Sequence, residues 1–275
     1  MAVSGRRGVI LWDTAQAHPR GVRLGDINDV LCVAYAPHGR WRAEARRNGT
    51  VGLVGELPGG QGGTLLRHEP ARLPGGDASP VTAVAVAPDS TWLVSGRHDG
   101  TVRVWDIATR ACASLLSADG GPVTAVVIAP DGSWFASADE AGRVRLWDTA
   151  SATGLLTLED GPGAVRGLAV SPDGGLLASG HADGGIRLWG GPSWTRTGLL
   201  TGHTGPVDAV AFTAAGTALA TAGRDGTLRV WDPCTGRALA AVRGEGPLTA
   251  CAWLPDGRGL AAGGERGLHL YDFRP

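Results

Sequence analysis

Short apolar runs separated by glycine and proline turns recur along the whole chain. A nearly continuous apolar run spans 207–212, small apolar residues fill 219–222, and residues 227–232 alternate between polar and apolar positions. A continuous run is typical of a strand buried on both faces, and alternation is typical of a strand with one exposed face. No amphipathic run has the length of a helix, so the pattern predicts an all-β chain.

The pattern returns with a fixed period. The stretch DGTLRVWD at 225–232 has close copies at 99–106, 141–148 and 183–190. The tryptophans of these copies follow one another at intervals of 42 residues, at Trp105, Trp147, Trp189 and Trp231. Weaker copies run over 7–13, 48–55 and 265–272, with Trp12, Val54 and Tyr271 in the place of the tryptophan. A constant period over a whole chain indicates a repeat architecture.

Each full repeat predicts four strands joined by tight turns. The turn after the first strand reads Pro-Asp-Gly at 130–132, 172–174 and 255–257. Proline presets the backbone for such a turn, and glycine tolerates its last position. In strand number, period, turn chemistry and the Trp-Asp dipeptide, these repeats resemble the WD40 repeats of β-propellers, in which each repeat builds one blade.

The resemblance implies a WD40 β-propeller in a seven-blade register with an incomplete first blade. Third strands end at seven places, but inner strands begin at only six, near Val30, Val81, Val123, Val165, Val207 and Leu248. Residues 1–13 supply only a third strand, and residues 20–25 fit an outer strand. The alternative is six closed blades plus an N-terminal extra strand, with 20–25 completing the blade that ends at Tyr271.

We expect one propeller domain over 1–275. Residues 1–29 form the partial first blade, 30–80 a degenerate second blade with a long loop at 57–80, and 81–275 the regular repeats. The degenerate blade reads WRAEARR at 41–47, where other blades are small and apolar. Arg42 and Glu44 share one face of this strand, and a charge inside a blade destabilises it unless it is paired.

The resemblance also implies a structural hydrogen-bond network in each blade, formed by a His, a Ser or Thr, an Asp and the Trp. Carried onto this sequence, the network is complete as His203, Thr221, Asp225 and Trp231. Two blades keep all members but the His, as Ser95, Asp99, Trp105 and as Ser179, Asp183, Trp189. A buried indole N–H needs an acceptor and a buried carboxylate needs donors, so the role implied is structural rather than catalytic.

Composition narrows the classes of function. The formal net charge of −1 gives no field that would attract nucleic acid or an anionic membrane. The four cysteines, Cys32, Cys112, Cys234 and Cys251, are widely scattered, which favours reduced thiols in a cytoplasmic protein. We see no secretory signal and no apolar run long enough to span a membrane. All basic residues are arginine, and with abundant Ala and Gly this suggests a GC-rich bacterial genome.

The sequence favours a non-catalytic protein. It contains no nucleophile elbow, HExxH or phosphate-binding loop, and its histidines show no ligand spacing, so we expect no cofactor and no metal. We predict a scaffold that binds a protein or peptide partner on the channel-mouth face of the propeller. One alternative is the C-terminal sensing or regulatory propeller of a larger signalling protein, such as a kinase or an ATPase. A metal-dependent propeller hydrolase is less favoured.

In the WD40 family, the residue after the start of the inner strand and the loop between the second and third strands lie around the channel mouth. The residues of this sequence at those positions are the predicted partner-binding residues, Arg97, His98, Asp139, Arg166, His181, Asp208 and Arg224. Arginine is enriched in interface hot spots, and we expect Arg97 and Arg166 to be exposed. Trp41, Trp92 and Trp134, at equivalent places near the other edge, suggest packing between blades or a second patch for a partner.

Overall fold

The computed structural model describes residues 2–5, 8–12, 21–23, 29–55, 64–66, 79–159, 161, 163–254 and 256–273. Every element in this part of the chain is a β-strand, as the sequence predicts. Contacts divide the chain into two compact units, one ending near Thr157 and one built from Leu158 onward together with the turn Ala141–Arg143. The prediction of one continuous domain stays a prediction.

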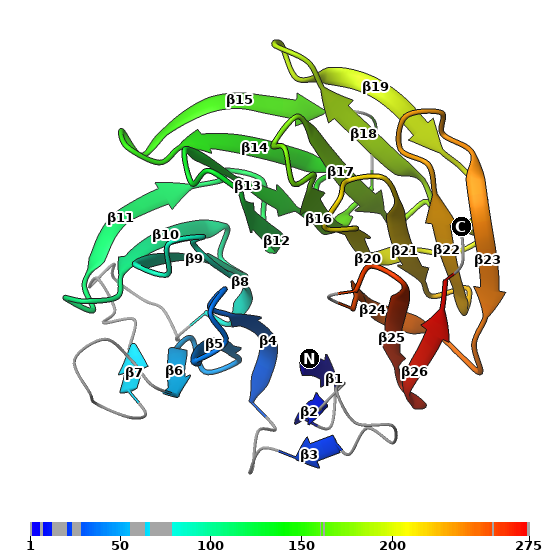
Figure 1. The fold of residues 1–275 in the computed structure, drawn as a ribbon. Helices are drawn as coiled ribbons and strands as arrows, with labels where there is room; N and C mark the ends of the chain where they lie inside the picture. The colour runs from blue at the N-terminus through cyan, green and yellow to red at the C-terminus, as the bar shows by residue number, and fades with distance from the viewer. Residues whose placement is uncertain are drawn as a thin grey trace. The chain divides into compact units, whose positions relative to one another are not determined.

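The first unit contains four antiparallel sheets (Figure 1). The first has β1 (Ala2–Gly5), β2 (Gly8–Trp12) and β3 (Gly21–Arg23), and the second has β4 (Val30–Tyr35), β5 (Trp41–Arg46), β6 (Val51–Gly55) and β7 (Thr64–Leu66). The third has β8 (Val81–Val86), β9 (Trp92–Arg97), β10 (Thr101–Asp106) and β11 (Cys112–Ser117). The fourth, most of which belongs to this unit, has β12 (Val123–Ile128), β13 (Trp134–Asp139), β14 (Arg143–Asp148) and β15 (Thr153–Glu159).

The second unit contains three further sheets. They are β16 (Val165–Val170), β17 (Leu176–His181), β18 (Ile186–Gly190) and β19 (Thr195–Leu200); then β20 (Val207–Phe212), β21 (Leu219–Gly223), β22 (Thr227–Trp231) and β23 (Ala238–Arg243); and last β24 (Leu248–Trp253), β25 (Gly259–Gly264) and β26 (Gly267–Asp272).

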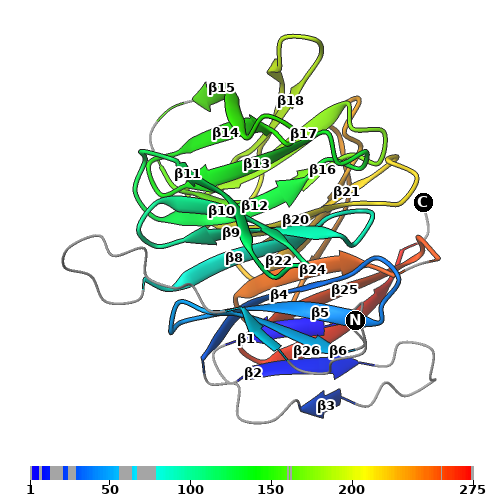
Figure 2. The same cartoon turned by 90° about the vertical axis from the view of Figure 1, so that its left-hand side faces the viewer.

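Within each unit the sheets pack side by side through their inner strands. β4, β8 and β12 are neighbours in the first unit, and β16, β20 and β24 are neighbours in the second. Each sheet continues in chain order from its first strand, and Figure 2 shows β8, β9, β10 and β11 following one another in this way. The six inner strands begin at the six residues that the sequence predicts.

The core lies between neighbouring sheets and is built from the apolar runs of the sequence. In the second unit, Ile186 and Leu188 of one sheet pack with Val207, Leu219 and Trp231 of the next. In the first unit, Trp41 is only 1% exposed, and Trp92 lies edge-on to Phe135 with ring centroids 6.4 Å apart. Of the two alternatives for Trp41 and Trp92, packing between sheets is therefore confirmed, and an exposed aromatic patch is not.

The structure corrects the seven-blade register. Six sheets, those that begin with β4, β8, β12, β16, β20 and β24, contain inner, second and third strands in the predicted order. The seven-blade register is unsupported, and the six-blade alternative fits. Residues 2–12 form two paired strands where the sequence predicts one third strand, and β3 pairs with β2. A third-strand motif alone does not define a blade, because the inner and second strands bury its apolar face.

The second sheet replaces the usual Trp–Ser pair with buried ions. By register, Glu44 stands where Ser95 stands in the next sheet, and Val54 stands where Trp105 does. Arg42 Nη2 and Arg46 Nη2 each lie 2.8 Å from the Glu44 carboxylate, which is only 2% exposed. The pairing of Arg42 with Glu44 is therefore confirmed. Most of the predicted loop 57–80 lies outside the described residues, but within it Thr64–Leu66 forms β7 and pairs with β6.

Candidate functional site

The four residues of the complete network form one hydrogen-bonded chain in the sheet β20–β23. Trp231 Nε1 donates to Thr221 Oγ1 at 2.9 Å, and Thr221 Oγ1 lies 2.8 Å from His203 Nε2. His203 Nδ1 lies 3.1 Å from Asp225 Oδ2. The directions of these bonds fit a neutral imidazole with its proton on Nδ1. The chain ties the loop before β20 to β21, β22 and the turn between them.

Burial and hydrogen bonding set the charges in this network. Burial alone would raise the pKa of Asp225, but the bonds that its carboxylate accepts from Thr204, Thr227 and His203 outweigh burial and lower the pKa to about 2. Burial lowers the pKa of His203, and the neighbouring Asp225 only partly opposes this. Near neutral pH the pair is therefore a neutral imidazole beside a carboxylate, held as part of the fold.

Three other sheets keep the Trp–Ser bond, and in one of them a histidine reaches the serine from a different position than that of His203. The indole N–H donates to a serine hydroxyl at 2.9 Å from Trp105, Trp147 and Trp189. In the sheet β16–β19, His181 at the end of the second strand brings Nε2 within 2.9 Å of Ser179 Oγ. Asp99 and Asp183 bond residues of their own turns, Thr101 and Gly185.

Three of the predicted partner-binding residues are buried. Arg97 is 6% exposed, and Asp139 and His181 are each 2% exposed. Arg97 donates to the carbonyl oxygen of Ser79 through Nε and Nη2, at 3.2 and 2.9 Å, and its Nη1 lies 3.6 Å from Asp99. The expectation that Arg97 is exposed is therefore wrong. Of these three side chains, that of His181 lies beside the serine of its own sheet, with Nε2 2.9 Å from Ser179 Oγ.

The inner strands share a β-bulge at their second residue. Register shifts occur between Val81 and Ala83, between Val165 and Gly167, and between Val207 and Ala209, and the same shift occurs in β4, β12 and β24. A bulge leaves its extra residue outside the ladder and re-aims the side chain. The bulge residues are Leu31, Thr82, Thr124, Arg166, Asp208 and Thr249.

The bulges of the second unit hold an ionic cluster. Asp208 of β20 lies between Arg166, the bulge residue of β16, and Arg224, which follows β21. Arg224 Nε donates to Asp208 Oδ2 at 2.6 Å, and Arg166 Nε lies 3.8 Å from Asp208 Oδ1. The Asp208 side chain is 10% exposed, whereas those of Arg166 and Arg224 are 35% and 50% exposed. The structure thus brings together three of the predicted partner-binding residues.

Close backbone packing makes this cluster possible. A Cβ on Gly167 would lie 3.0 Å from the carbonyl oxygen of Asp208 and 3.2 Å from the Cα of Ala209. The residue after the Arg166 bulge must therefore be small for β16 and β20 to approach this closely. The close approach sets Arg166 beside Asp208.

The bulge residues of the first unit are uncharged: Leu31 is apolar, and Thr82 and Thr124 are polar. The Thr82 hydroxyl donates to the carbonyl oxygens of Gly96 and Val123, which joins neighbouring sheets. The Thr124 hydroxyl is buried and has no hydrogen-bond partner within the described part of the chain. His98 is exposed and lies in the turn after β9, the position that Arg224 holds in its own sheet.

The repeats of this chain match a known protein family. The WD domain, G-beta repeat family matches residues 69–106, 110–148, 154–190 and 194–232, more than half of the chain. The chain belongs to the WD40 family. Each of the last three WD40 matches runs from the outer strand of one sheet through the third strand of the next, so each repeat links two sheets. A search of the curated proteins gives no match.

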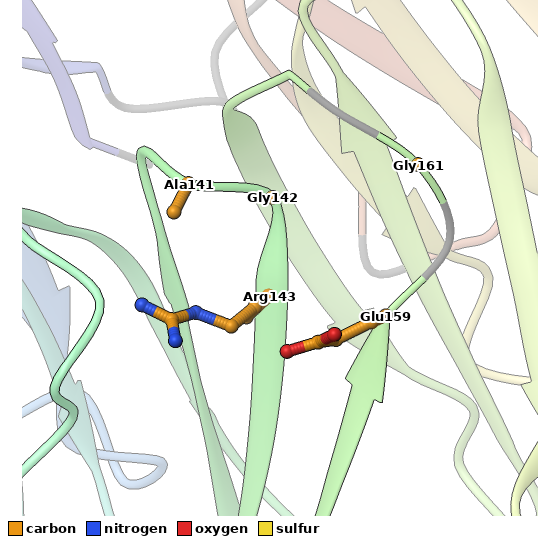
Figure 3. Close-up of a pocket in the computed structure, with 5 residues that line it drawn as sticks. All are labelled: Ala141, Gly142, Arg143, Glu159 and Gly161. Atoms are coloured by element: carbon orange, nitrogen blue, oxygen red, sulfur yellow. The ribbon is translucent and has the colours of Figure 1, made fainter.

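In the part of the WD40 chain that the structure describes, a pocket lies beside the turn after β13. It is lined by Ala141, Gly142, Arg143, Glu159 and Gly161, and Figure 3 shows Arg143 and Glu159 as its two charged side chains. A pocket with two glycines, one alanine and a single pair of opposite charges supplies neither an apolar floor nor convergent polar groups for a small ligand.

Other features of the described residues bear on chemistry. Within the described ranges, no group of three or more His, Cys, Asp or Glu residues could hold a metal ion. All four cysteines are free thiols, and burial raises the pKa of Cys251 to about 12, so this thiol is unreactive. No helix among the residues that the structure describes is long and apolar enough to cross a membrane.

Sequence reasoning found the positions of Arg166, Asp208 and Arg224 but missed that they form a cluster. Arg166 and Asp208 are 42 residues apart and meet only because neighbouring inner strands pack side by side. The repeat period itself was the available signal, since residues one period apart on inner strands of a WD40 propeller are neighbours in space. The charge of one bulge could therefore have been compared with that of the next.

Proposed function

We propose that this WD40 propeller is a non-catalytic scaffold that binds a protein or peptide partner at the bulged ends of its inner strands in the second unit. The observation that carries the proposal is the cluster of Arg166, Asp208 and Arg224. It sets two arginines, each at least one-third exposed, on one mostly buried carboxylate. WD40 propellers generally bind protein partners, and this chain belongs to that family.

Physical arguments support the choice of this edge. The bulge residues are fixed by strands on both sides, so their side chains are held in place before a partner arrives, and less conformational entropy is lost on binding. Arginine is enriched in hot spots. Thr249, the bulge residue of the next strand, is exposed beside the cluster's strand and extends the same edge. His98 of the first unit is the remaining exposed candidate.

The buried candidates have a different part in the proposal. We assign Arg97, Asp139 and His181 to the interior of the blades, where Arg97 and His181 hold loops and serines in place. The cytoplasm of a bacterial cell is the setting we propose, in keeping with four free thiols. The roles as the sensing propeller of a larger signalling protein and as a metal-dependent hydrolase stay predictions.

The test is capture of partners from a lysate of the source organism with three forms of the protein. The first is the wild type, and the second carries Arg166→Glu and Arg224→Glu. The third carries Arg237→Glu and Arg243→Glu, which make the same charge change at exposed residues beside and on the outer strand β23. Circular dichroism and thermal melting check that all three are folded.

We expect the wild type and the β23 control to capture the same partner and the cluster variant to lose it. Equal capture by all three folded proteins would place the binding surface elsewhere, and loss by both variants would show a general effect of charge. A protein that captures nothing in any form would contradict the scaffold role.

A further inference from the structure

The cluster of Arg166, Asp208 and Arg224 is incompletely satisfied by the chain itself. Asp208 Oδ1 and Arg166 Nε are both buried and have no hydrogen-bond partner among the described residues. Their separation of 3.8 Å allows ionic attraction but is too long for a hydrogen bond. Buried polar groups in folded proteins are rarely left in this state, since each one destabilises the fold. Arg166 Nε is a donor that lacks an acceptor, and a ligand with an acceptor group can supply one.

The two arginines keep most of their donors available. Arg224 uses Nε on Asp208, and its two Nη groups form no hydrogen bond with the described residues. Arg166 likewise forms no hydrogen bond with the described residues, and its only ionic contact there is Asp208. The guanidinium groups are thus fixed through one shared carboxylate while their Nη donors remain for another acceptor. A planar guanidinium with two adjacent donors matches a carboxylate or phosphate group.

The net charge of the cluster favours a negatively charged ligand. Two arginines and one aspartate give the cluster a net charge of +1, so one acidic group would neutralise it. The partly buried setting strengthens that attraction relative to bulk water. A cationic ligand would instead meet two guanidinium groups before it could reach Asp208, which is 10% exposed. The arrangement therefore disfavours basic peptides.

We infer that the cluster recognises an acidic side chain of an extended peptide segment of the partner, with Arg166 and Arg224 donating to its carboxylate and Asp208 holding both arginines in position. The inference rests on the proposed scaffold function and adds the chemistry of its ligand. A phosphorylated serine offers the same acceptor chemistry, and the experiment separates it from a carboxylate.

The probe is a displayed library of random twelve-residue peptides selected on the folded wild type. Each selected peptide is synthesised in three forms, one as selected, one with every Asp and Glu changed to its amide, and one with each acidic residue replaced by phosphoserine. Fluorescence anisotropy measures their binding to the wild type, to Arg166→Gln/Arg224→Gln and to the control Arg237→Gln/Arg243→Gln.

We expect Asp or Glu in the selected peptides and at least about tenfold weaker binding of the amide forms to the wild type. The cluster variant should bind acidic and amide forms equally weakly, and the control should behave as the wild type. Tighter binding of the phosphoserine forms by tenfold or more would overturn the assignment of a carboxylate. Peptides that bind with no change on amide substitution would leave the scaffold standing and overturn the acidic ligand. Selection of no peptide that discriminates wild type from cluster variant would overturn both.

Discussion

His203 fills the space over Gly223 so closely that no side chain can be added to the glycine. A Cβ on Gly223 would lie 2.5 Å from His203 Nδ1. In the neighbouring sheet the arrangement is reversed, since the strand ends in His181 and Gly161 stands in the loop, four residues before the inner strand. Both imidazoles bring Nε2 to a hydroxyl that accepts an indole N–H, at Ser179 and Thr221. In these two sheets one imidazole completes the network, from either the loop or the strand.

The first prediction is that position 223 tolerates no side chain while His203 is present. Gly223→Ala should lower the free energy of unfolding by about 1–3 kcal/mol, because the added methyl group displaces His203 from Thr221 and Asp225. The same change in a His203→Ala background should have a smaller effect, because the contact with the imidazole is gone and the contact with Asp225 Oδ1 at 2.7 Å remains. Urea unfolding of the four proteins would measure the difference. Gly175→Ala is the control, since its Cβ would meet Asp173 at an ordinary 3.5 Å. Equal costs in both backgrounds would contradict the exclusion.

The second prediction is that the imidazole can be supplied from position 223, at the end of β21, instead of from position 203 in the loop. The double variant His203→Gly/Gly223→His copies the arrangement of the sheet β16–β19, so its imidazole should again reach Thr221 Oγ1. We expect the double variant to be more stable than either single variant. The coupling free energy between the two changes should be about 1 kcal/mol or more. Thermal melting of the four proteins gives the coupling. Simple additivity of the two single changes would show that the two positions do not share one space.

The third prediction is a loss of stability in acid, with two separate ranges. Both groups have a folded pKa below the unfolded value, so the unfolded chain binds more protons and stability falls as the pH falls. His203 should lose its contribution as the pH drops below about 6.5, and Asp225 should lose about 2 kcal/mol as the pH falls from 3.8 to about 2. Urea unfolding from pH 8 to pH 2 would measure both.

Matched variants assign those two ranges. His203→Gln should flatten the wild-type difference in stability between pH 7.5 and pH 5, and Asp225→Asn should reduce the difference between pH 4 and pH 2. Each variant should leave the other range closer to that of the wild type. An unchanged profile in His203→Gln would mean that other groups control the fall below pH 6.5.

The fourth prediction concerns the buried ions of β5. Glu44→Gln should lower the free energy of unfolding by about 2–4 kcal/mol, because Arg42 and Arg46 then lose their shared carboxylate inside the blade. Glu245→Gln, a change at an exposed residue, is the control. Chemical denaturation of both variants measures the difference, and equal small effects would contradict a stabilising ion network.

A companion variant tests whether the ions replace the usual pair. Arg42→Leu/Glu44→Ser/Val54→Trp gives this sheet the residues that the next sheet has at Leu93, Ser95 and Trp105. It should be more stable than Glu44→Gln, since the Trp–Ser bond of the other blades can form. A triple variant that is less stable than Glu44→Gln would mean that the surroundings of β5 no longer fit an indole.

The sequence predicted what depends on a single repeat. The starts of the inner strands follow from continuous apolar runs, and the bonds of Trp231 and Trp189 follow from residues ten positions away in adjacent strands. It could not predict the burial of Arg97, because Arg97 bonds the carbonyl oxygen of Ser79, which lies 18 residues away in the chain. It also placed one strand within 2–12, where two strands pair.

At the candidate site, too, the sequence predicted positions within one repeat but not the contacts between repeats. The positions of Arg166 and Asp208 come from the repeat, but their ionic contact comes from the packing of β16 against β20. That packing depends on Gly167, whose role is visible only when the opposing backbone is in place. Side chains that face another repeat are therefore where sequence reasoning is weakest.

The most direct test of the central claim is site-specific photocrosslinking in cells. A photoreactive residue replaces Thr249, the exposed bulge residue of β24, and a second protein carries it at Leu239 on the outer strand β23, where the side chain is 46% exposed. We predict that the protein with the photoreactive residue at 249 forms a crosslink to a partner and that the protein with it at 239 does not. A partner crosslinked from Leu239 with none from Thr249 would contradict binding at the bulged ends of the inner strands.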